Sequence, residues 1–261
     1  MSLADMFNLD GKVAIIPGGS GAIGSAIALG LCRAGAELSI VDRDGDGLAE
    51  TCARMRESGS QPLAVAADCT VKEDADRAVA ETLERFGRVD IIINAIGGGA
   101  GKVLFDAHEY PKTEWDWIMD LNVTAVVFPT QAAVRAMIEG GRGGRVVNIS
   151  SVRGQLGINA GYSAYVAAKG AINSLTRQWA TEWAKYGITV NAISPTFVDT
   201  PQVAMLLDDP DFKAGVVSRI PVGRVGETSD LVAPILMFCS DAASFVTGQI
   251  LGIDGGLTAT Q

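Results

Sequence analysis

Tyr165 and Lys169 stand four residues apart in the segment Tyr-Val-Ala-Ala-Lys. On a helix this spacing places the two side chains on one face. A lysine ammonium beside a phenol favours the phenolate, so a tyrosine whose ordinary pKa is about 10 becomes a base closer to neutral pH. A lone pair of this kind also arises by chance, and the rest of the chain must decide whether it forms a site.

A glycine-rich segment near the N-terminus has the pattern Gly19-x-Gly21-x-x-Gly24. It follows an apolar run at 13–16 and precedes a helical pattern. Glycines let the backbone approach a pyrophosphate, and the free N–H groups of a helix N-terminus bind it. A tight turn has the same pattern, but the position between a strand and a helix favours a dinucleotide site.

An acidic residue, Asp42, ends the second apolar run, 18 residues after Gly24. A carboxylate there accepts hydrogen bonds from both ribose hydroxyls of adenosine and repels a 2′-phosphate, which favours NAD over NADP. The neighbouring Arg43 leaves the alternative open, because a guanidinium can pair with that phosphate. Its other interpretation is a solvated loop arginine or one lying over the adenine.

Composition limits the classes of function. The 261 residues carry a net charge of −9 and no basic block, which argues against nucleic acid as a partner. The N-terminus lacks the features of a secretion signal, and we see no apolar run that reaches membrane-spanning length. The cysteines have no Cys-x-x-Cys spacing and there is one histidine, so we expect no metal site and a reduced, cytoplasmic protein. The cysteines are Cys32, Cys52, Cys69 and Cys239.

Apolar runs alternate with helical patterns along the whole chain, which predicts a parallel sheet with helices on both faces. The expected strands are 13–16, 38–41, 62–66, 91–93, 145–149, 189–193 and 249–253. The longest expected helices are 71–86, 115–138 and 161–186, and residues 197–227 are expected to be irregular. We therefore predict an α/β fold in which residues 1–261 form a single domain, a Rossmann-type, doubly wound, parallel, seven-stranded sheet.

With these features in place, the chain resembles the short-chain dehydrogenase/reductase family, in its subgroup of about 250 residues. The resemblance covers Leu9 to Thr258. Besides the loop and the Tyr-Lys pair, it rests on Asp68, Asn94-Ala-Ile-Gly97, Asn122, Asn191 to Thr200, and Gly248-Gln249 with Ile253 to Gly256.

The chain departs from the family pattern at several positions. Pro17 and Ala22 replace a threonine and a glycine of the glycine-rich loop. Ala95, Ile96 and Thr196 replace residues expected around the cofactor. Ser151 and Tyr165 are 14 residues apart where 13 are expected. The extra residue falls in 153–161 and is expected to reshape the pocket wall.

The resemblance implies a hydride transfer between a nicotinamide cofactor and a secondary alcohol or ketone, without a metal. It implies the catalytic set Asn122, Ser151, Tyr165 and Lys169. Tyr165 would exchange the proton, Lys169 would lower its pKa and bind ribose, Ser151 would hydrogen-bond the alkoxide, and Asn122 would help to hold a water. The implied cofactor-binding residues are Gly18, Ser20, Gly21, Ala22, Ile23, Gly24, Asp42, Arg43, Asp68, Cys69, Asn94, Ala95, Ile96, Gly97, Ile149, Tyr165, Lys169, Pro195, Thr196, Val198 and Thr200.

Polar residues of the loops expected around the pocket favour a polyol, a sugar or a sugar acid as substrate, as in the family's sugar and polyol dehydrogenases of the gluconate 5-dehydrogenase type. Arg153 binds a carboxylate in one interpretation and is an ordinary loop arginine in the other. The substrate candidates are Lys102, His108, Arg153, Asn159, Tyr162 and Gln202.

Three functions are compatible with the sequence. The leading one is an NAD-dependent dehydrogenase of polyhydroxylated substrates. The second is an NADPH-dependent carbonyl reductase of 3-oxoacyl or ketone substrates that uses Arg43. The third is a dinucleotide-binding regulator that has lost turnover. The family resemblance also implies a homotetramer, and the apolar long helices are consistent with it.

Overall fold

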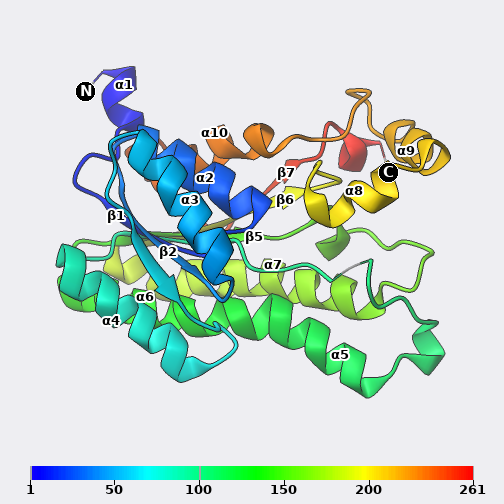
Figure 1. The fold of residues 1–261 in the computed structure, drawn as a ribbon, viewed down its shortest axis with the longest axis horizontal. Coiled ribbons are helices and arrows are strands. Elements are labelled where there is room, and N and C mark those ends of the chain that lie inside the picture. Colours follow the sequence, from blue (N-terminus) through cyan, green and yellow to red (C-terminus); the bar gives the residue numbers. More distant parts are fainter. Residues whose placement is uncertain (1, 100, 261) are drawn as a thin grey trace.

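Seven parallel strands form one sheet in residues 2–99 and 101–260, which are the residues that the computed structural model describes. Their order across the sheet is β3-β2-β1-β4-β5-β6-β7 (Figure 1). The strands are β1 (Val13–Pro17), β2 (Glu37–Asp42), β3 (Leu63–Ala66), β4 (Ile91–Asn94), β5 (Gly144–Ile149), β6 (Ile188–Pro195) and β7 (Ile250–Ile253). The predicted fold class is confirmed, and each strand lies within three residues of its expected bounds.

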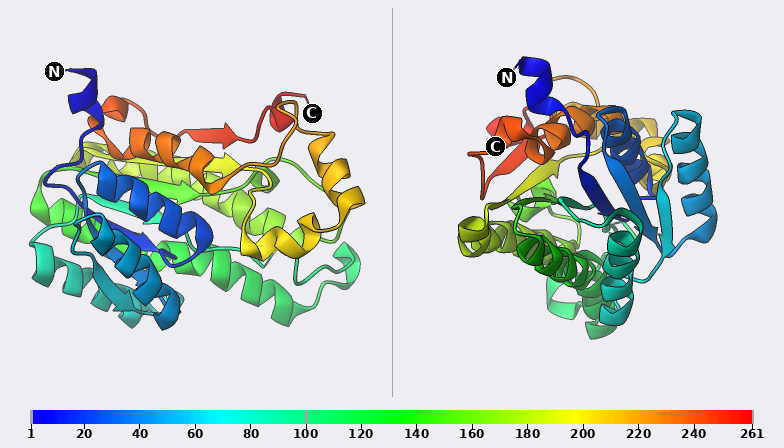
Figure 2. Two further views of the ribbon diagram at one scale, coloured as in Figure 1. Left: turned by 45° about the horizontal axis from the view of Figure 1, so that its top comes forward. Right: turned by 90° about the vertical axis from the view of Figure 1, so that its left-hand side faces the viewer.

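Two helical layers cover the sheet (Figures 1 and 2). One layer holds α2 (Ala22–Arg33), α3 (Gly45–Glu57) and α10 (Thr228–Cys239). The other holds α4 (Lys72–Phe86), α6 (Ala125–Gly140) and α7 (Ser163–Trp183). The short α1 (Leu3–Phe7) precedes β1, and α5 (Lys112–Met119) precedes α6.

Alternate side chains of the strands enter two separate cores. Ile16 and Ile93 pack under α2 and α10, whereas Ile15 and Ile92 pack under the α4, α6 and α7 layer. All four are essentially inaccessible to solvent. This is why the strand sequences are apolar at consecutive positions, as parallel strands covered on both faces require.

The segment 197–227 differs from the prediction, because it contains two helices, α8 (Pro201–Leu207) and α9 (Pro210–Val217). Pro201 and Pro210 stand in the first turn of these helices. The backbone N–H groups of a first turn have no partner within the helix, so the missing N–H of proline costs nothing there, and its fixed φ suits a helix. Asp209 caps α9 by accepting from the backbone N–H of Asp211 and Phe212. These prolines therefore begin helices in a segment that is expected to be irregular.

The expected helix at 115–138 is longer and contains a change of winding. A π-helical turn at Asp120–Thr124 separates α5 from α6, and Pro129 lies inside α6. The continuous helix Lys112–Gly140 has the length and mean hydropathy, 1.2, of a candidate membrane span, contrary to our expectation of none. Half of its apolar window is buried against the rest of the chain, as in the core helix of a soluble protein.

The strand order fixes where a ligand can bind. The chain leaves β1 toward β2 and β3 on one side, and returns to β4 on the other. The crossovers therefore diverge at the carboxyl ends of β1 and β4, which opens a crevice there. The glycine-rich loop follows β1 at this point, and the loops after β4, β5 and β6 face the same edge.

Candidate active site

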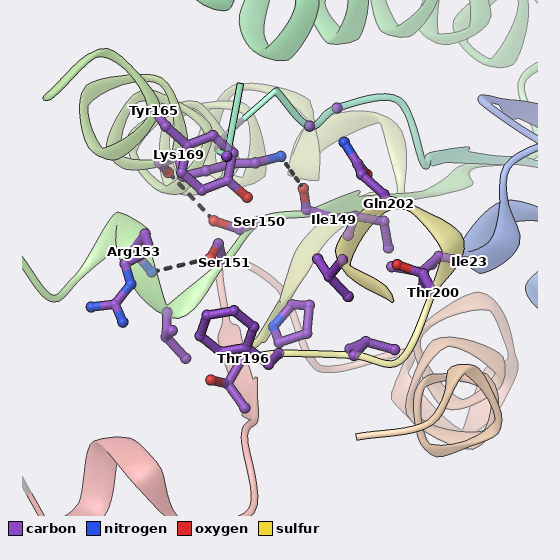
Figure 3. Close-up of a pocket in the computed structure, with 18 of the residues that line it drawn as sticks. Ile23, Ile149, Ser150, Ser151, Arg153, Tyr165, Lys169, Thr196, Thr200 and Gln202 are labelled. Carbon is purple, nitrogen blue, oxygen red and sulfur yellow. Dashed lines mark hydrogen bonds between the residues drawn. The ribbon is translucent and has the colours of Figure 1, made fainter. Parts of the chain in front are cut away.

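A cavity of about 200 Å³ lies at the carboxyl edge of the sheet (Figure 3). Its walls come from segments that are far apart in the sequence. The loop after β4 supplies Gly97 and Gly98, the end of β5 supplies Ser151, α7 supplies Tyr165, and the loop after β6 supplies Thr196. The cavity therefore exists only in the folded chain, where the switch point of the sheet brings these loops together.

Helix α7 positions Tyr165 and Lys169 one turn apart on its pocket face. The Lys169 Nζ lies 5.7 Å from the centre of the Tyr165 ring. Lys169 is 3% exposed, and its Nζ donates a hydrogen bond of 3.0 Å to the carbonyl oxygen of Ile149. The spacing seen in the sequence thus places both groups in one buried site.

Burial shifts the pKa values of both groups. It lowers the pKa of Lys169 to about 8, because the charged ammonium loses its hydration. It also raises the pKa of Tyr165 above its ordinary value of 10, and a hydrogen bond with Ser151 opposes this rise. The sequence predicts that Lys169 lowers the pKa of the phenol, but burial outweighs the groups that lower it.

Ser151 lies at the end of β5 and begins a short 3₁₀ helix, Val152–Gly154. Its hydroxyl accepts a hydrogen bond of 3.1 Å from the backbone N–H of Arg153. The preceding Ser150 donates to the Oδ1 of Asn173 on α7 at 2.6 Å. This bond ties the end of β5 to α7, and it keeps the Ser151 hydroxyl next to the phenol.

Asn122 lies in the π-helical turn and is completely buried. Its amide makes two 3.0 Å bonds with the backbone of Gly98, accepting from the N–H and donating to the carbonyl. A Cβ on Gly97 would lie 2.8 Å from the Asn122 Oδ1 and 2.9 Å from the Lys169 Nζ. Asn122 therefore holds the loop after β4 in contact with the lysine, where only glycine fits.

The glycine-rich loop has the close approaches expected of a phosphate cradle. A Cβ on Gly24 would lie 2.1 Å from the carbonyl oxygen of Gly18, and a Cβ on Gly18 would lie 2.6 Å from the Ile96 nitrogen. A Cβ on Gly21 would meet nothing closer than the Gly18 carbonyl oxygen at 3.5 Å, so there is open space beside this residue. The α2 N-terminus begins here without a side-chain cap, which leaves N–H groups for an anion.

The Thr196 hydroxyl is a second feature that fits a bound ligand, after the uncapped N-terminus of α2. Its hydroxyl oxygen is buried at the pocket wall and has no hydrogen-bond partner among the described residues. Buried polar groups without partners are costly and rare in folded proteins. The residues around the crevice thus fit a nicotinamide dinucleotide, with the phosphates at the α2 N-terminus and a polar group against Thr196.

Asp42 and Arg43 lie at the end of β2. The Asp42 carboxylate accepts from the N–H of Ser20 at 3.3 Å and from that of Asp44 at 3.2 Å, which fixes it beside the glycine-rich loop. Hydrogen bonds from Thr70 are the main cause of the lowered pKa of the Asp68 carboxyl. The exposed Arg43 side chain also lowers this pKa through its positive charge. The charge of Arg43 is therefore felt by at least one carboxylate.

The structure separates the residues predicted from the sequence into two groups. About half of the cofactor candidates line the pocket, and the others lie in the glycine-rich loop and at the ends of β2, β3 and β4. The pocket members are Ile23, Ala95, Ile96, Gly97, Ile149, Tyr165, Lys169, Pro195, Thr196, Val198 and Thr200. The others are Gly18, Ser20, Gly21, Ala22, Gly24, Asp42, Arg43, Asp68, Cys69 and Asn94.

The side chain of Asn94 does not reach the pocket. It donates to the hydroxyl of Thr130 and to the Oδ1 of Asn148, both at 2.8 Å. Asn148 donates in turn to Thr176 on α7 at 2.9 Å. This buried chain of hydrogen bonds joins β4, β5, α6 and α7, so the Asn94 side chain holds the frame of the site together.

Three of the six substrate candidates line the pocket: Arg153, Tyr162 and Gln202. The other three, Lys102, His108 and Asn159, are exposed and lie outside its lining. The His108 side chain is 78% exposed and stands beside Glu109. Loop position alone could not distinguish these two groups.

Sequence reasoning missed several lining residues. They are mostly small or apolar and carry no chemical signature, and one of them, Val203, lies on the unpredicted α8. They are Gly98, Gly101, Ser150, Val152, Ile158, Phe197 and Val203. Their common signal is position, since each follows the carboxyl end of a strand.

No cluster of three or more His, Cys, Asp or Glu side chains suited to a metal occurs in the described part of the chain. The four cysteines carry free thiols, and burial raises the pKa of Cys69 to about 12. The chemistry available at the pocket is therefore that of hydroxyl, phenol, ammonium and guanidinium groups.

Comparison with known proteins places this geometry in a family. The family model described as Enoyl-(Acyl carrier protein) reductase matches residues 19–258. Gluconate 5-dehydrogenase of Gluconobacter oxydans is 35% identical over all of both chains. The 2-dehydro-3-deoxy-D-gluconate 5-dehydrogenase of Escherichia coli is 37% identical over 97% of this chain and 98% of its own.

Solved structures agree with these relatives. A gluconate 5-dehydrogenase from Burkholderia cenocepacia, in complex with NADP and tartrate, superposes with a TM-score of 0.91 at 33% identity over 99% of both chains. A short-chain type dehydrogenase/reductase from Mycobacterium marinum superposes with a TM-score of 0.90 at 32% identity, also over 99% of both chains.

The shifted pKa of Lys169 predicts a pH dependence of stability. The unfolded chain keeps the lysine proton up to about pH 10.5, whereas the folded chain releases it near 8. The unfolded state therefore binds more protons in this interval, and raising the pH favours the folded state. We expect the free energy of unfolding of the wild type, minus that of Lys169→Met, to rise by up to about 3 kcal/mol between pH 8 and 10.5.

Urea denaturation at a series of pH values measures this difference. Lys213→Met, which removes an exposed lysine of α9, is the matched control and should show no such rise. A difference for Lys169→Met that is flat or falls with pH would contradict the buried, destabilised ammonium.

Proposed function

This chain belongs to the short-chain dehydrogenase/reductase family, and we propose that its pocket oxidises a secondary alcohol of a polyhydroxylated substrate with NAD. The family's enzymes are NAD(P)-dependent oxidoreductases that act on CH–OH groups. One observation carries the proposal: Ser151, Tyr165 and Lys169 line a single cavity beside a crevice that fits a dinucleotide.

Tyr165 removes the proton from the substrate hydroxyl in this proposal, and Ser151 donates a hydrogen bond to the developing alkoxide. When bound, the nicotinamide cofactor supplies the hydride acceptor. The Ser151 hydroxyl lies close enough to the phenol to oppose the rise of its pKa, so the substrate oxygen would lie within reach of both groups.

Charge explains why the base needs its cofactor. Burial favours the neutral Tyr165 phenol, because it raises the pKa above its ordinary value. Lys169, with a pKa of about 8, is mostly protonated at neutral pH and supplies one positive charge on the same face of α7. The positive ring of an oxidised nicotinamide would supply a second and favour the phenolate further.

The relatives support a sugar-type substrate. Two of them are named gluconate 5-dehydrogenase and 2-dehydro-3-deoxy-D-gluconate 5-dehydrogenase. The pocket offers several polar groups to such a molecule, including Tyr162 and Gln202. We therefore place the substrate among polyols, sugars and sugar acids, and the fold alone cannot select one of them.

Asp42 supports NAD as the cofactor, because its carboxylate is held at the end of β2, where a 2′-phosphate would be repelled. The second candidate is an NADPH-dependent carbonyl reductase. It is favoured by the exposed Arg43 and by the NADP bound to the related Burkholderia cenocepacia enzyme. Between these two, the Asp42 carboxylate that is hydrogen-bonded beside the glycine-rich loop favours NAD.

The proposed base is tested with Tyr165→Phe. Loss of the phenolic oxygen removes the proton acceptor but leaves the ring in place. We expect kcat for NADH production on a screen of polyols, sugars and sugar acids to fall by about 10²- to 10⁴-fold. The dissociation constant of NADH, measured by its fluorescence, should change little. Unaltered turnover would refute Tyr165 as the base, whereas binding without turnover in the wild type would favour a regulator.

Cofactor choice is tested by comparing kcat/KM for NAD+ and NADP+. We expect the wild type to prefer NAD+, and Asp42→Ala to lose about tenfold or more of its NAD+ efficiency while NADP+ gains. Arg43→Ala is the companion variant. A wild type that prefers NADP+, and loses that preference in Arg43→Ala, would establish the carbonyl reductase alternative.

We also propose that the enzyme is a homotetramer. The surface of the chain exposes large apolar side chains, including Phe245 at 102% and Val222 at 64%. Such side chains are common at subunit interfaces. Light scattering coupled to gel filtration should give about four times the mass of the 27.2 kDa chain. A mass of one chain would contradict this state.

A further inference from the structure

We propose that Arg153 is the carboxylate-binding residue of this pocket, so that the substrate is a polyhydroxylated acid such as an aldonate and not a neutral polyol. This inference rests on the proposed function and narrows its substrate class. It starts from a charged group that lines the pocket and has no carboxylate partner among the described residues.

Arg153 is 9% exposed, although a guanidinium stays charged at any physiological pH. No carboxylate of the described residues forms a salt bridge with it. Its guanidinium makes one hydrogen bond, 2.9 Å long, from Nη1 to the carbonyl oxygen of Gly157. A buried charge without a counter-ion is costly, so a pocket that contains one gains free energy when an anion enters.

The surroundings of Arg153 increase this cost. Burial lowers the pKa of Arg153, and the nearby Arg219 lowers it further. Arg219 is an exposed residue that follows α9, and no ion pair or hydrogen bond of its side chain is found in the described structure. The two neighbouring cations therefore repel each other, and of the two only Arg153 lines the pocket. A carboxylate bound to Arg153 would relieve this repulsion.

The charged side chains that line the pocket are all positive. Its lining contains Arg153 and Lys169 but no aspartate or glutamate. The chain as a whole has 30 acidic and 21 basic residues, so a random surface would favour acids. The pocket is thus electropositive within an acidic protein, as expected for a site that takes an anionic substrate.

The position of Arg153 suits a substrate that reacts at Ser151 and Tyr165. Its backbone N–H donates to the Ser151 hydroxyl, so the two residues form one rigid unit at the end of β5. Figure 3 shows Arg153 beside Ser151, at the opposite side of the pocket from Ile23 and Thr200. Cofactor and carboxylate would therefore occupy opposite ends, with the reacting hydroxyl between them.

The bond from Arg153 to Gly157 also suggests a purely structural role, namely holding the 155–162 loop in place. That role uses one donor of the five in a guanidinium, and the remaining donors still form an edge for bidentate binding of a carboxylate. A structural role would affect acidic and neutral substrates alike, whereas carboxylate binding affects only the acids. This difference decides the experiment.

The test compares D-gluconate with D-glucitol, which has the same carbon chain and a CH2OH group in place of the carboxylate. In Arg153→Gln we expect kcat/KM for gluconate to fall on the order of 100-fold, mainly through KM, and that for glucitol to change by less than about threefold. Arg153→Lys keeps the charge but not the fork and should recover part of the loss. Arg142→Gln removes an exposed arginine far from the pocket and should behave as wild type.

An equal fall on both substrates in Arg153→Gln, or no fall on gluconate, would overturn the inference. Turnover of neither substrate by the wild type would instead count against the proposed function. In that event the thermal shift of the NADH-loaded protein distinguishes a failure of the Arg153 inference from a failure of the proposed function. Gluconate, and not glucitol, should stabilise the wild type but not Arg153→Gln, and equal stabilisation of both proteins would overturn the role of Arg153.

Discussion

The burial of one ammonium group organises the functional end of this molecule. Lys169 reaches the carboxyl end of β5 from inside α7 and donates to the Ile149 carbonyl. Lys169 can reach this carbonyl only if α7 keeps one position along the direction of the strands. The hydrogen bonds from Ser150 to Asn173 and from Asn148 to Thr176 fix that position of α7 relative to β5. The same register places Tyr165 beside Ser151, so the frame of the fold and the geometry of the site depend on one set of contacts.

Much of this arrangement could be predicted from the sequence. Parallel strands covered on both faces are apolar throughout, so Ile91 to Ile93 were recognisable, and the glycine-rich loop follows directly from the need for close backbone approach. The Tyr165 and Lys169 pair was visible because helical spacing is a local property. Asp42 was visible because strand ends in this fold lie at a known edge.

The remainder depends on tertiary context. Pro201 and Pro210 begin helices, because a proline that breaks one helix can start the next. Asn94 was expected at the cofactor, but its side chain turns inward to Thr130 and Asn148, a choice between two faces that spacing cannot reveal. The pKa of Tyr165 was expected to fall, but burial raises it, and the extent of burial belongs to the fold and not to the motif.

Several features of the site have one physical cause, which is the burial of polar or charged groups without full compensation. The pKa values of Lys169 and Arg153 are lowered and that of Tyr165 is raised, which are the shifts that burial imposes on charge without compensation. The Thr196 hydroxyl is buried without a partner in the described residues. The burial of each of these groups has a free-energy cost that a bound molecule would offset. Because the costs are borne before binding, the groups need not reorganise during the reaction, and this preorganisation is what makes electrostatic catalysis effective.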